Sequence, residues 1–210
     1  EIEAPLTVMK FCELLNEEFP DGVVNTVTGY GSEVGDYLVT SPDVDKISFT
    51  GSVTTGMMIS QKAGMKKVTL ELGGNDPMIV LKDADLDKAV KGVINGAFLN
   101  AGQVCMGVKR IIVEEEIASE FSEKLVLETE KLVMGNPLDK KTTLGTLISE
   151  KAAIQVEETV NNAVGEGAKI LTGGKRDGAY YEATVIDNVV PSMDLVVRET
   201  FGPVAPIIRV

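Results

Sequence analysis

The sequence contains no histidine and no tryptophan, and only two of its 210 residues are cysteines. Without imidazole, the chain has no Cys-His or Ser-His-Asp catalytic group and no histidine-containing zinc site. Its two cysteines, Cys12 and Cys105, form neither a CxxC metal pair nor a disulfide framework, which is typical of reducing compartments. We therefore expect no metal site, and any catalytic base must be a carboxylate, a lysine or water.

Long apolar runs and positive charge are also scarce. No stretch approaches the ~20 apolar residues of a membrane-spanning helix, and "EIEAPLT" at the N-terminus lacks the basic-then-apolar pattern of a signal peptide. Thirty-two acidic residues against twenty basic ones give a net charge of −12, which repels nucleic-acid phosphates and anionic lipid. The sequence favours a cytoplasmic protein that binds neither nucleic acid nor membranes.

Helix and strand signals alternate along the chain. Apolar residues at helical spacing predict helices over 5–19, 32–41, 52–64, 83–100, 118–133 and 149–167. Short apolar and β-branched runs predict strands over 22–29, 45–51, 66–74, 77–81, 109–115, 168–173, 182–187, 195–199 and 205–210. This alternation predicts an α/β fold of parallel sheets with flanking helices. Cys12, on an apolar helix face, is expected in the core.

A double glycine, Gly73-Gly74, interrupts the pattern, which then restarts. It predicts a boundary between two α/β pieces, residues 1–72 and 73–210. The chain begins directly at a helix and ends inside the apolar strand "APIIRV", and a buried strand needs neighbours on both sides. We therefore expect a fragment with two partial domains.

Two glycine clusters follow predicted strands. "TGYGSEVG" offers Gly29, Gly31 and Gly35 in a spacing close to the dinucleotide-binding fingerprint. No acidic residue stands ~20 residues further on after a clear second strand. The spacing therefore favours an ordinary strand-to-helix turn.

The other cluster, "FTGSVTTG", places Gly51 and Ser52 between the end of a predicted strand and the start of the next helix. Free N–H groups and a hydroxyl at that point would suit an anion. Gly56 in the same helix indicates a close neighbour, either a ligand or a tightly packed strand.

One cysteine and two carboxylates are candidates for chemistry. Cys105 lies in the small, polar segment "NAGQVCMG", which fits either a reactive or a structural thiol. A thiol nucleophile without histidine needs another base, and Glu71 at the end of "VTLELGG", if partly buried, would suit a general base for water. Glu199 in "RETFGPV" stands at another strand end. For both carboxylates a solvated surface position is the alternative.

Five stretches, spread over essentially the whole chain, together resemble the aldehyde dehydrogenase superfamily in order and spacing. They are "FTGSVTTG" (49–56), "LELGGNDP" (70–77), "GQVC" (102–105), "GNPLD" (135–139) and "ETFGPV" (199–204). "GQVCMGVKR" and "ETFGPVAPIIRV" are similar to the branch with lactaldehyde, non-phosphorylating glyceraldehyde-3-phosphate and phosphonoacetaldehyde dehydrogenases. The resemblance implies an aldehyde dehydrogenase-like fold and a small hydroxylated or anionic aldehyde as substrate.

The resemblance also implies residue roles. Cys105 matches the nucleophile that forms a thiohemiacetal and then a thioester, while hydride leaves to NAD or NADP. Glu71 matches the glutamate that activates the hydrolytic water. The implied cofactor-binding residues are Gly51, Ser52, Gly56, Leu72, Glu199 and Phe201, the last two at the nicotinamide ribose and ring. In this family "TGYGSEVG" lies near the adenine end, so its glycines are not expected to hold phosphates.

On the same resemblance, residues 1–72 are the C-terminal half of a cofactor-binding domain and residues 73–210 a catalytic domain truncated at its C-terminus. The family's oxyanion-stabilising asparagine and subunit-pairing strand lie outside such a fragment. We therefore expect little or no activity from the 210-residue chain alone, and a homo-dimer or tetramer for the full-length enzyme. Two alternatives remain: a cofactor-independent thiol hydrolase or acyl-transfer enzyme using Cys105 and Glu71, and a non-catalytic structural relative.

Overall fold

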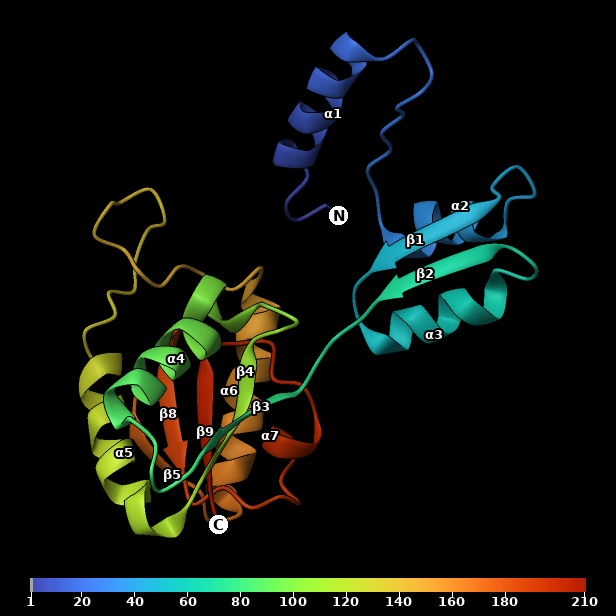
Figure 1. Cartoon of the computed structure of the whole chain (residues 1–210). Helices are drawn as coiled ribbons and strands as arrows, with labels where there is room; N and C mark the ends of the chain where they lie inside the picture. Colours follow the sequence, from blue (N-terminus) through green and yellow to red (C-terminus); the bar gives the residue numbers. More distant parts are fainter. Residues whose placement is uncertain (1) are drawn as a thin grey trace. The chain divides into compact units, whose positions relative to one another are not determined.

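The computed structural model describes residues 2–210 and separates into two compact units (Figure 1). The first unit ends at Leu72 and the second runs from Gly73 to Val210. Both combine helices with sheets that are mainly parallel, which confirms the predicted α/β fold class. The double glycine at Gly73-Gly74 therefore opens the second unit.

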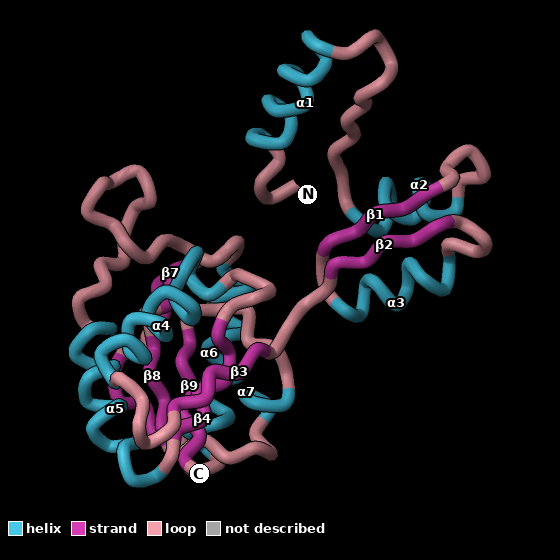
Figure 2. Tube along the Cα trace, viewed as in Figure 1, coloured by secondary structure: helices cyan, strands magenta, loops and turns pink. Residues whose placement is uncertain are grey.

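The first unit is built around a two-stranded parallel sheet (Figure 2). In chain order its elements are α1 (Leu6–Glu18), the π-helix η1 (Gly31–Gly35), α2 (Asp36–Thr40), β1 (Lys46–Thr50), α3 (Val53–Lys62) and β2 (Lys67–Glu71). Every second residue of β1 and β2 is the more buried one, as expected for strands with one covered face. The core of this unit consists of Val39 on α2, Ile59 on α3 and Ala63, which directly follows α3. The alternation leaves Glu71 at an exposed position of β2.

Two predictions for the first unit are wrong. Residues 22–29 form a loop, because β1 pairs only with β2 within the described chain and offers this β-branched run no ladder. Helix α1 forms as expected but has no buried residue, and Cys12 on it is only partly buried. Most of its apolar side chains are exposed, Phe11 at 59%. Amphipathic sequence alone therefore does not place a residue in the core.

The second unit contains a five-stranded mixed sheet in the order β3-β4-β9-β8-β5. Its elements in chain order are β3 (Asp76–Val80), α4 (Leu86–Phe98), the 3₁₀-helix η2 (Leu99–Gly102), β4 (Val108–Val113), α5 (Glu115–Thr129), α6 (Glu150–Gly165), β5 (Lys169–Thr172), β6 (Arg176–Asp177), β7 (Tyr180–Tyr181), β8 (Thr184–Asp187), α7 (Asp194–Val197) and β9 (Val204–Arg209). Within this sheet β5 runs antiparallel to β8 and the other pairs are parallel; β6 and β7 form a separate two-stranded antiparallel sheet. The five-stranded sheet is therefore mostly parallel, as predicted, with one antiparallel strand at its edge.

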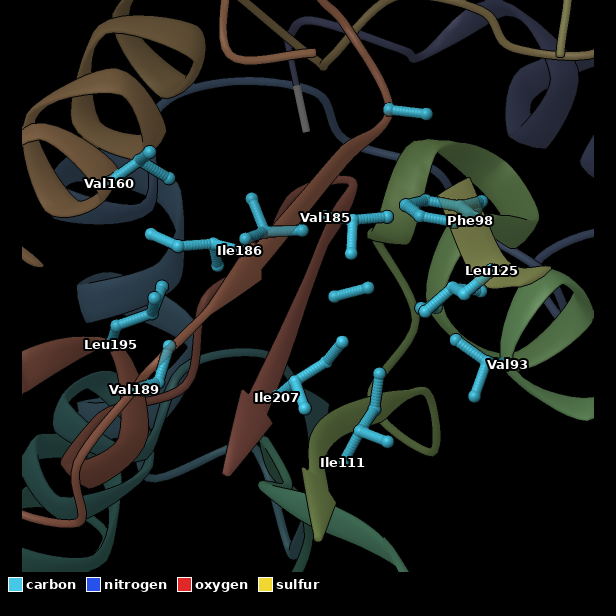
Figure 3. Packing of buried hydrophobic residues seen from close by; sticks show 14 of the residues in the cluster. Val93, Phe98, Ile111, Leu125, Val160, Val185, Ile186, Val189, Leu195 and Ile207 are labelled. Carbon is cyan, nitrogen blue, oxygen red and sulfur yellow. The ribbon is translucent and has the colours of Figure 1, made fainter. Parts of the chain in front are cut away.

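Helices cover both faces of this sheet (Figure 3). All four residues of β8 are buried. Val185 points toward Val93 of α4 and Leu125 of α5, and the next residue, Ile186, points toward Val160 of α6. Alternate residues of one strand thus enter opposite layers of a single core, as the two-residue period of a strand requires. This core holds the loops at the strand ends that carry Cys105 and Glu199.

Three local predictions for the second unit differ from the structure. Residues 195–199 were expected as a strand, but Asp194–Val197 form the short helix α7, which packs against α6 and buries Leu195. Helix α5 ends at Thr129 instead of residue 133. The apolar strand β9 has a neighbour on each side, β4 and β8. Its backbone is therefore paired on both sides within the chain, so the expectation that this strand lacks neighbours is wrong.

Tyr181 on β7 gives a prediction about stability at high pH. Burial raises the pKa of Tyr181 from 10.0 to about 12. The folded state therefore holds this proton more tightly than the unfolded state, and the resulting stabilisation is present below pH 10 and disappears as the pH rises from 10 to about 12. We expect the unfolding free energy of the parent to fall by about 2 to 3 kcal/mol more than that of Tyr181→Phe over this range. Urea titrations of both proteins at the two pH values measure the difference, and equal losses would contradict it.

Candidate functional site

The chain takes an unusual turn before Cys105. Asn100, Ala101 and Gly102 have φ values of 52°, 53° and 72°, so consecutive residues are left-handed. This region costs a residue with a side chain roughly 1 to 2 kcal/mol. Strain of this kind is kept where the surroundings enforce it, and it often marks functional sites. The turn leads to an exposed Cys105.

Side-chain hydrogen bonds hold this turn in place. The Gln103 side-chain amide donates to the Asn100 carbonyl at 3.1 Å and to the Thr146 carbonyl at 3.3 Å. Its side-chain oxygen accepts from the Ile148 N–H at 2.7 Å. Gln103 therefore ties the segment before Cys105 to the loop that precedes α6. The glutamine of "GQVC" thus has a structural reason to be there.

Close backbone contacts also require glycine around Cys105. A Cβ on Gly74 would lie 2.4 Å from the Cys105 carbonyl oxygen, and one on Gly102 would lie 2.0 Å from the Gly202 carbonyl oxygen. Both distances are too short for any side chain. Three segments therefore come into direct backbone contact here: the start of the second unit, the segment before β4 and the segment before β9.

Glu199 joins the same convergence of segments. The Gly74 N–H donates to its carboxylate at 3.3 Å, and a Cβ on Gly73 would lie 1.9 Å from the other carboxylate oxygen. Glu199 also lines a cavity of about 240 Å³ together with Gln103, Gln155 and Phe201. The structure therefore brings Glu199 and Phe201 to one hollow beside the turn that leads to Cys105.

The sequence analysis missed Lys109, which is 3% exposed on β4. Its ammonium donates to the Gly102 carbonyl and lies 5.3 Å from the centre of the Phe201 ring. Burial lowers the pKa of Lys109, while the charges of Glu199, Asp76 and Cys105 act in the opposite direction. A signal was present in "VKRIIV", where the alternation puts Lys109 on the same face as Ile111 and Val113. A lysine on the core face of a strand indicates a special role.

The remaining predicted cofactor-binding residues lie in the first unit. The Ser52 hydroxyl caps α3 by accepting from the Thr55 N–H at 3.2 Å. The Gly51 N–H donates to the Glu71 carbonyl at 3.0 Å, so the expectation that this N–H is free is wrong, because the ladder between β1 and β2 extends by one residue. Donors for an anion at this helix end must come from the first turn of α3.

Gly56 and Leu72 contact each other. Gly56 is buried in α3, and a Cβ there would lie 2.6 Å from the Leu72 side chain. The sequence left two explanations for Gly56, a ligand or a tightly packed strand. Within this unit, the close neighbour is the side chain of Leu72, packed against the helix. Leu72 in turn follows β2 directly, so it links the packing of α3 to the segment that ends at Glu71.

Glu71, the predicted base, is exposed at the end of β2. Partial burial was the condition under which Glu71 would suit a general base. The first unit by itself does not bury Glu71, because alternation turns this side chain away from the apolar face. The structure thus brings Glu199 and Phe201 to one cavity of the second unit, beside the segment that leads to Cys105. Glu71, Gly51, Ser52, Gly56 and Leu72 belong to the first.

Within residues 2–210, no helix combines the length and the apolar character that a bilayer span needs. Among the same residues, no group of three or more Cys, Asp and Glu side chains is arranged to hold a metal ion.

Known proteins similar to this chain agree with one another. The model of the aldehyde dehydrogenase family matches residues 1–210. A lactaldehyde dehydrogenase from Methanococcus aeolicus is 43% identical over 99% of this chain and 46% of its own length. A 3-sulfolactaldehyde dehydrogenase from Priestia aryabhattai is 48% identical over 97% of this chain and 43% of its own length.

Solved structures give the same picture. The glyceraldehyde-3-phosphate dehydrogenase of Methanocaldococcus jannaschii, complexed with NADP, superimposes with a TM-score of 0.97 at 47% identity, over 100% of this chain and 47% of that one. A betaine aldehyde dehydrogenase from Staphylococcus aureus in complex with NAD⁺ gives a TM-score of 0.93 at 39% identity, over 98% of this chain and 43% of that one. The chain spans less than half the length of these relatives. It belongs to the aldehyde dehydrogenase family.

Proposed function

We propose that this chain, as part of an enzyme of its relatives' length, oxidises a small aldehyde to the carboxylic acid with NAD or NADP. The observation that carries the proposal is the strained turn that leads to the exposed Cys105, next to the cavity lined by Glu199 and Phe201, within a chain of this family. A structural cysteine would not need an exposed position after a strained turn. The site supports covalent catalysis by a thiol.

In the first half-reaction, the Cys105 thiolate attacks the aldehyde carbon and a thiohemiacetal forms. Bound NAD(P)⁺ supplies an acceptor for the hydride that leaves this carbon. The attack leaves an oxyanion on this carbon; as the hydride departs, the C=O bond forms again and Cys105 carries the acyl group as a thioester. The turn at Asn100–Gly102 fixes the backbone next to the sulfur, which keeps the nucleophile in place for attack.

The residues present fit a nicotinamide cofactor. Glu199 offers a carboxylate and Phe201 an aromatic face to the same cavity, a pairing suited to ribose hydroxyls and a flat ring. In the first unit, the first turn of α3 offers backbone N–H groups of the kind that hold phosphates. Residues 1–72 would then contribute to cofactor binding and residues 73–210 to the thiol chemistry.

In the second half-reaction, Glu71 takes a proton from water, and the resulting hydroxide attacks the thioester carbon. The acid leaves, and the Cys105 sulfur regains its starting form. A general base typically contributes about 10²- to 10⁴-fold to such a step. Because Glu71 is exposed within its own unit, we infer that the groups that let it act as a base are supplied by the complete enzyme.

For the substrate we propose a small aldehyde with a hydroxyl or anionic group. The relatives named for lactaldehyde, 3-sulfolactaldehyde and glyceraldehyde-3-phosphate support this choice, since all three names describe three-carbon hydroxyaldehydes. We also propose that the complete enzyme is a homo-oligomer. The 210-residue chain by itself is expected to have little or no activity.

A kinetic panel tests the proposed function. The complete enzyme is assayed with NAD and NADP against lactaldehyde, glyceraldehyde-3-phosphate, a long-chain aldehyde and an aromatic aldehyde. We expect the largest kcat/KM with one of the two three-carbon substrates, and no aldehyde oxidation without cofactor. A preference for the long-chain or aromatic aldehyde would overturn the substrate proposal. Cofactor-independent hydrolysis of thioesters or esters without aldehyde oxidation would overturn the dehydrogenase in favour of a thiol hydrolase.

A further inference from the structure

We propose that Lys109 is a positioning residue of the thiol site, whose buried ammonium holds the Asn100–Gly102 turn and, through it, the loop that carries Cys105. The role of Cys105 itself rests on the proposed function. None of the roles assigned above to Cys105, Glu71 or Glu199 involves this lysine.

The geometry around Lys109 carries the proposal. Its side chain starts on β4, in the core-facing register of Ile111, and is 3% exposed. The ammonium donates to the Gly102 carbonyl, which belongs to the last left-handed residue of the turn. Carbonyls in such a turn have no regular partner, so a cationic donor is a strong one. Lys109 is therefore a clamp on the segment that carries Cys105.

The buried ammonium of Lys109 is compensated by its neighbours. Burying an ammonium is unfavourable unless negative or polar groups compensate it. The ionisable groups that interact with it are Glu199 before β9, Asp76 on β3 and Cys105 before β4. The ring of Phe201 adds a cation–π contact at 5.3 Å. These contacts keep the ammonium at the junction of the three segments, where it donates to the Gly102 carbonyl.

Alternatives for Lys109 are less consistent with these contacts. A lysine that only fills space would extend its ammonium to solvent, whereas this one ends in the protein interior. A lysine that only pairs with a carboxylate would form a direct ion pair, and its direct hydrogen bond goes instead to a backbone carbonyl. The position at the junction of the three segments, beside the nucleophile's loop, fits control of that loop.

Alkylation of Cys105 by iodoacetamide tests the proposal without cofactor or aldehyde. The rate is followed by mass spectrometry on the peptide that carries Cys105, in the complete enzyme and near neutral pH. We expect Lys109→Met to change the alkylation rate by about tenfold, because the turn before Cys105 loses its hydrogen bond to a charged donor. Lys109→Arg, which keeps the charge, should stay within about threefold of the parent. Lys131→Met, at an exposed lysine after α5, is the matched control and should leave the rate unchanged.

A pH series separates charge from structure. If Lys109 acts by holding the turn, the difference between Lys109→Met and the parent persists at alkaline pH, where both thiols are ionised. A folded Lys109→Met protein that is alkylated at the parent rate near neutral pH would overturn the proposal, as would a difference that alkaline pH removes. If Lys109→Met does not fold, Lys109→Gln and Lys109→Arg give the same comparison. Because this readout needs no turnover, it fails or succeeds independently of the dehydrogenase assignment.

Discussion

Replacing Cys105 by alanine is expected to lower kcat of the complete enzyme by at least about 10⁴-fold, as removal of a covalent nucleophile does in other enzymes. The thioester cannot form without the sulfur, so no amount of substrate restores the rate. Binding of NAD or NADP should persist, because the proposed cofactor contacts lie at Glu199, Phe201 and the first unit. Stopped-flow detection of the reduced cofactor, with fluorescence titration of its binding, measures both effects.

Cys12→Ala is the matched control for this variant. Cys12 lies partly buried on α1, a helix without buried residues, and alanine is the best helix former. We expect kcat/KM within about twofold of the parent, a change of less than about 0.5 kcal/mol in barrier height. Loss of activity in Cys12→Ala, or full activity in Cys105→Ala, would contradict the assignment of the nucleophile.

Replacing Glu71 by glutamine is expected to lower the steady-state rate by about 10²-fold or more while leaving the first turnover fast. Glutamine keeps the size and polarity of the side chain but cannot accept the proton of water. Oxidation of the aldehyde would then proceed once per site, and hydrolysis of the thioester would become the slow step. Rapid-mixing experiments should show a burst of reduced cofactor close to one equivalent per site.

Glu17→Gln provides a control for the loss of one negative charge. Glu17 is an exposed carboxylate on α1, so its substitution should leave both phases unchanged. If Glu71→Gln lost the burst together with the steady state, the residue would act before the thioester, in activating Cys105. If both phases kept the parent rates, Glu71 would not be the base.

Local sequence patterns predicted much of the fold, because periodicity reports which face of an element is buried. Strand β8 and helix α6 formed where apolar spacing placed them. The failures were at residues 22–29 and 195–199, where β-branched and apolar residues suggested strands. Whether such a run becomes a strand depends on a neighbouring ladder, which is a long-range property. The antiparallel edge at β5 escaped prediction for the same reason.

The candidate site was predictable in part. The residues themselves indicated Cys105 and Glu199, and the family resemblance added Phe201; the structure places Glu199 and Phe201 at one cavity beside the loop of Cys105. Local sequence did not reveal the left-handed turn at Asn100–Gly102, since asparagine and alanine there carry no distinct signal. Lys109 was missed because a basic residue in a strand is usually solvated, and only its register shows that it faces inward.

The central claim is that Cys105 carries the oxidised substrate as a thioester, and mass spectrometry of a trapped enzyme tests it most directly. Glu71→Gln enzyme is mixed with lactaldehyde and NAD or NADP, quenched in acid and digested. The account predicts that the peptide with Cys105 gains the mass of the lactoyl group, in proportion to the reduced cofactor formed. Formation of reduced cofactor with Cys105 unmodified, or with the acyl group on another residue, would contradict the account.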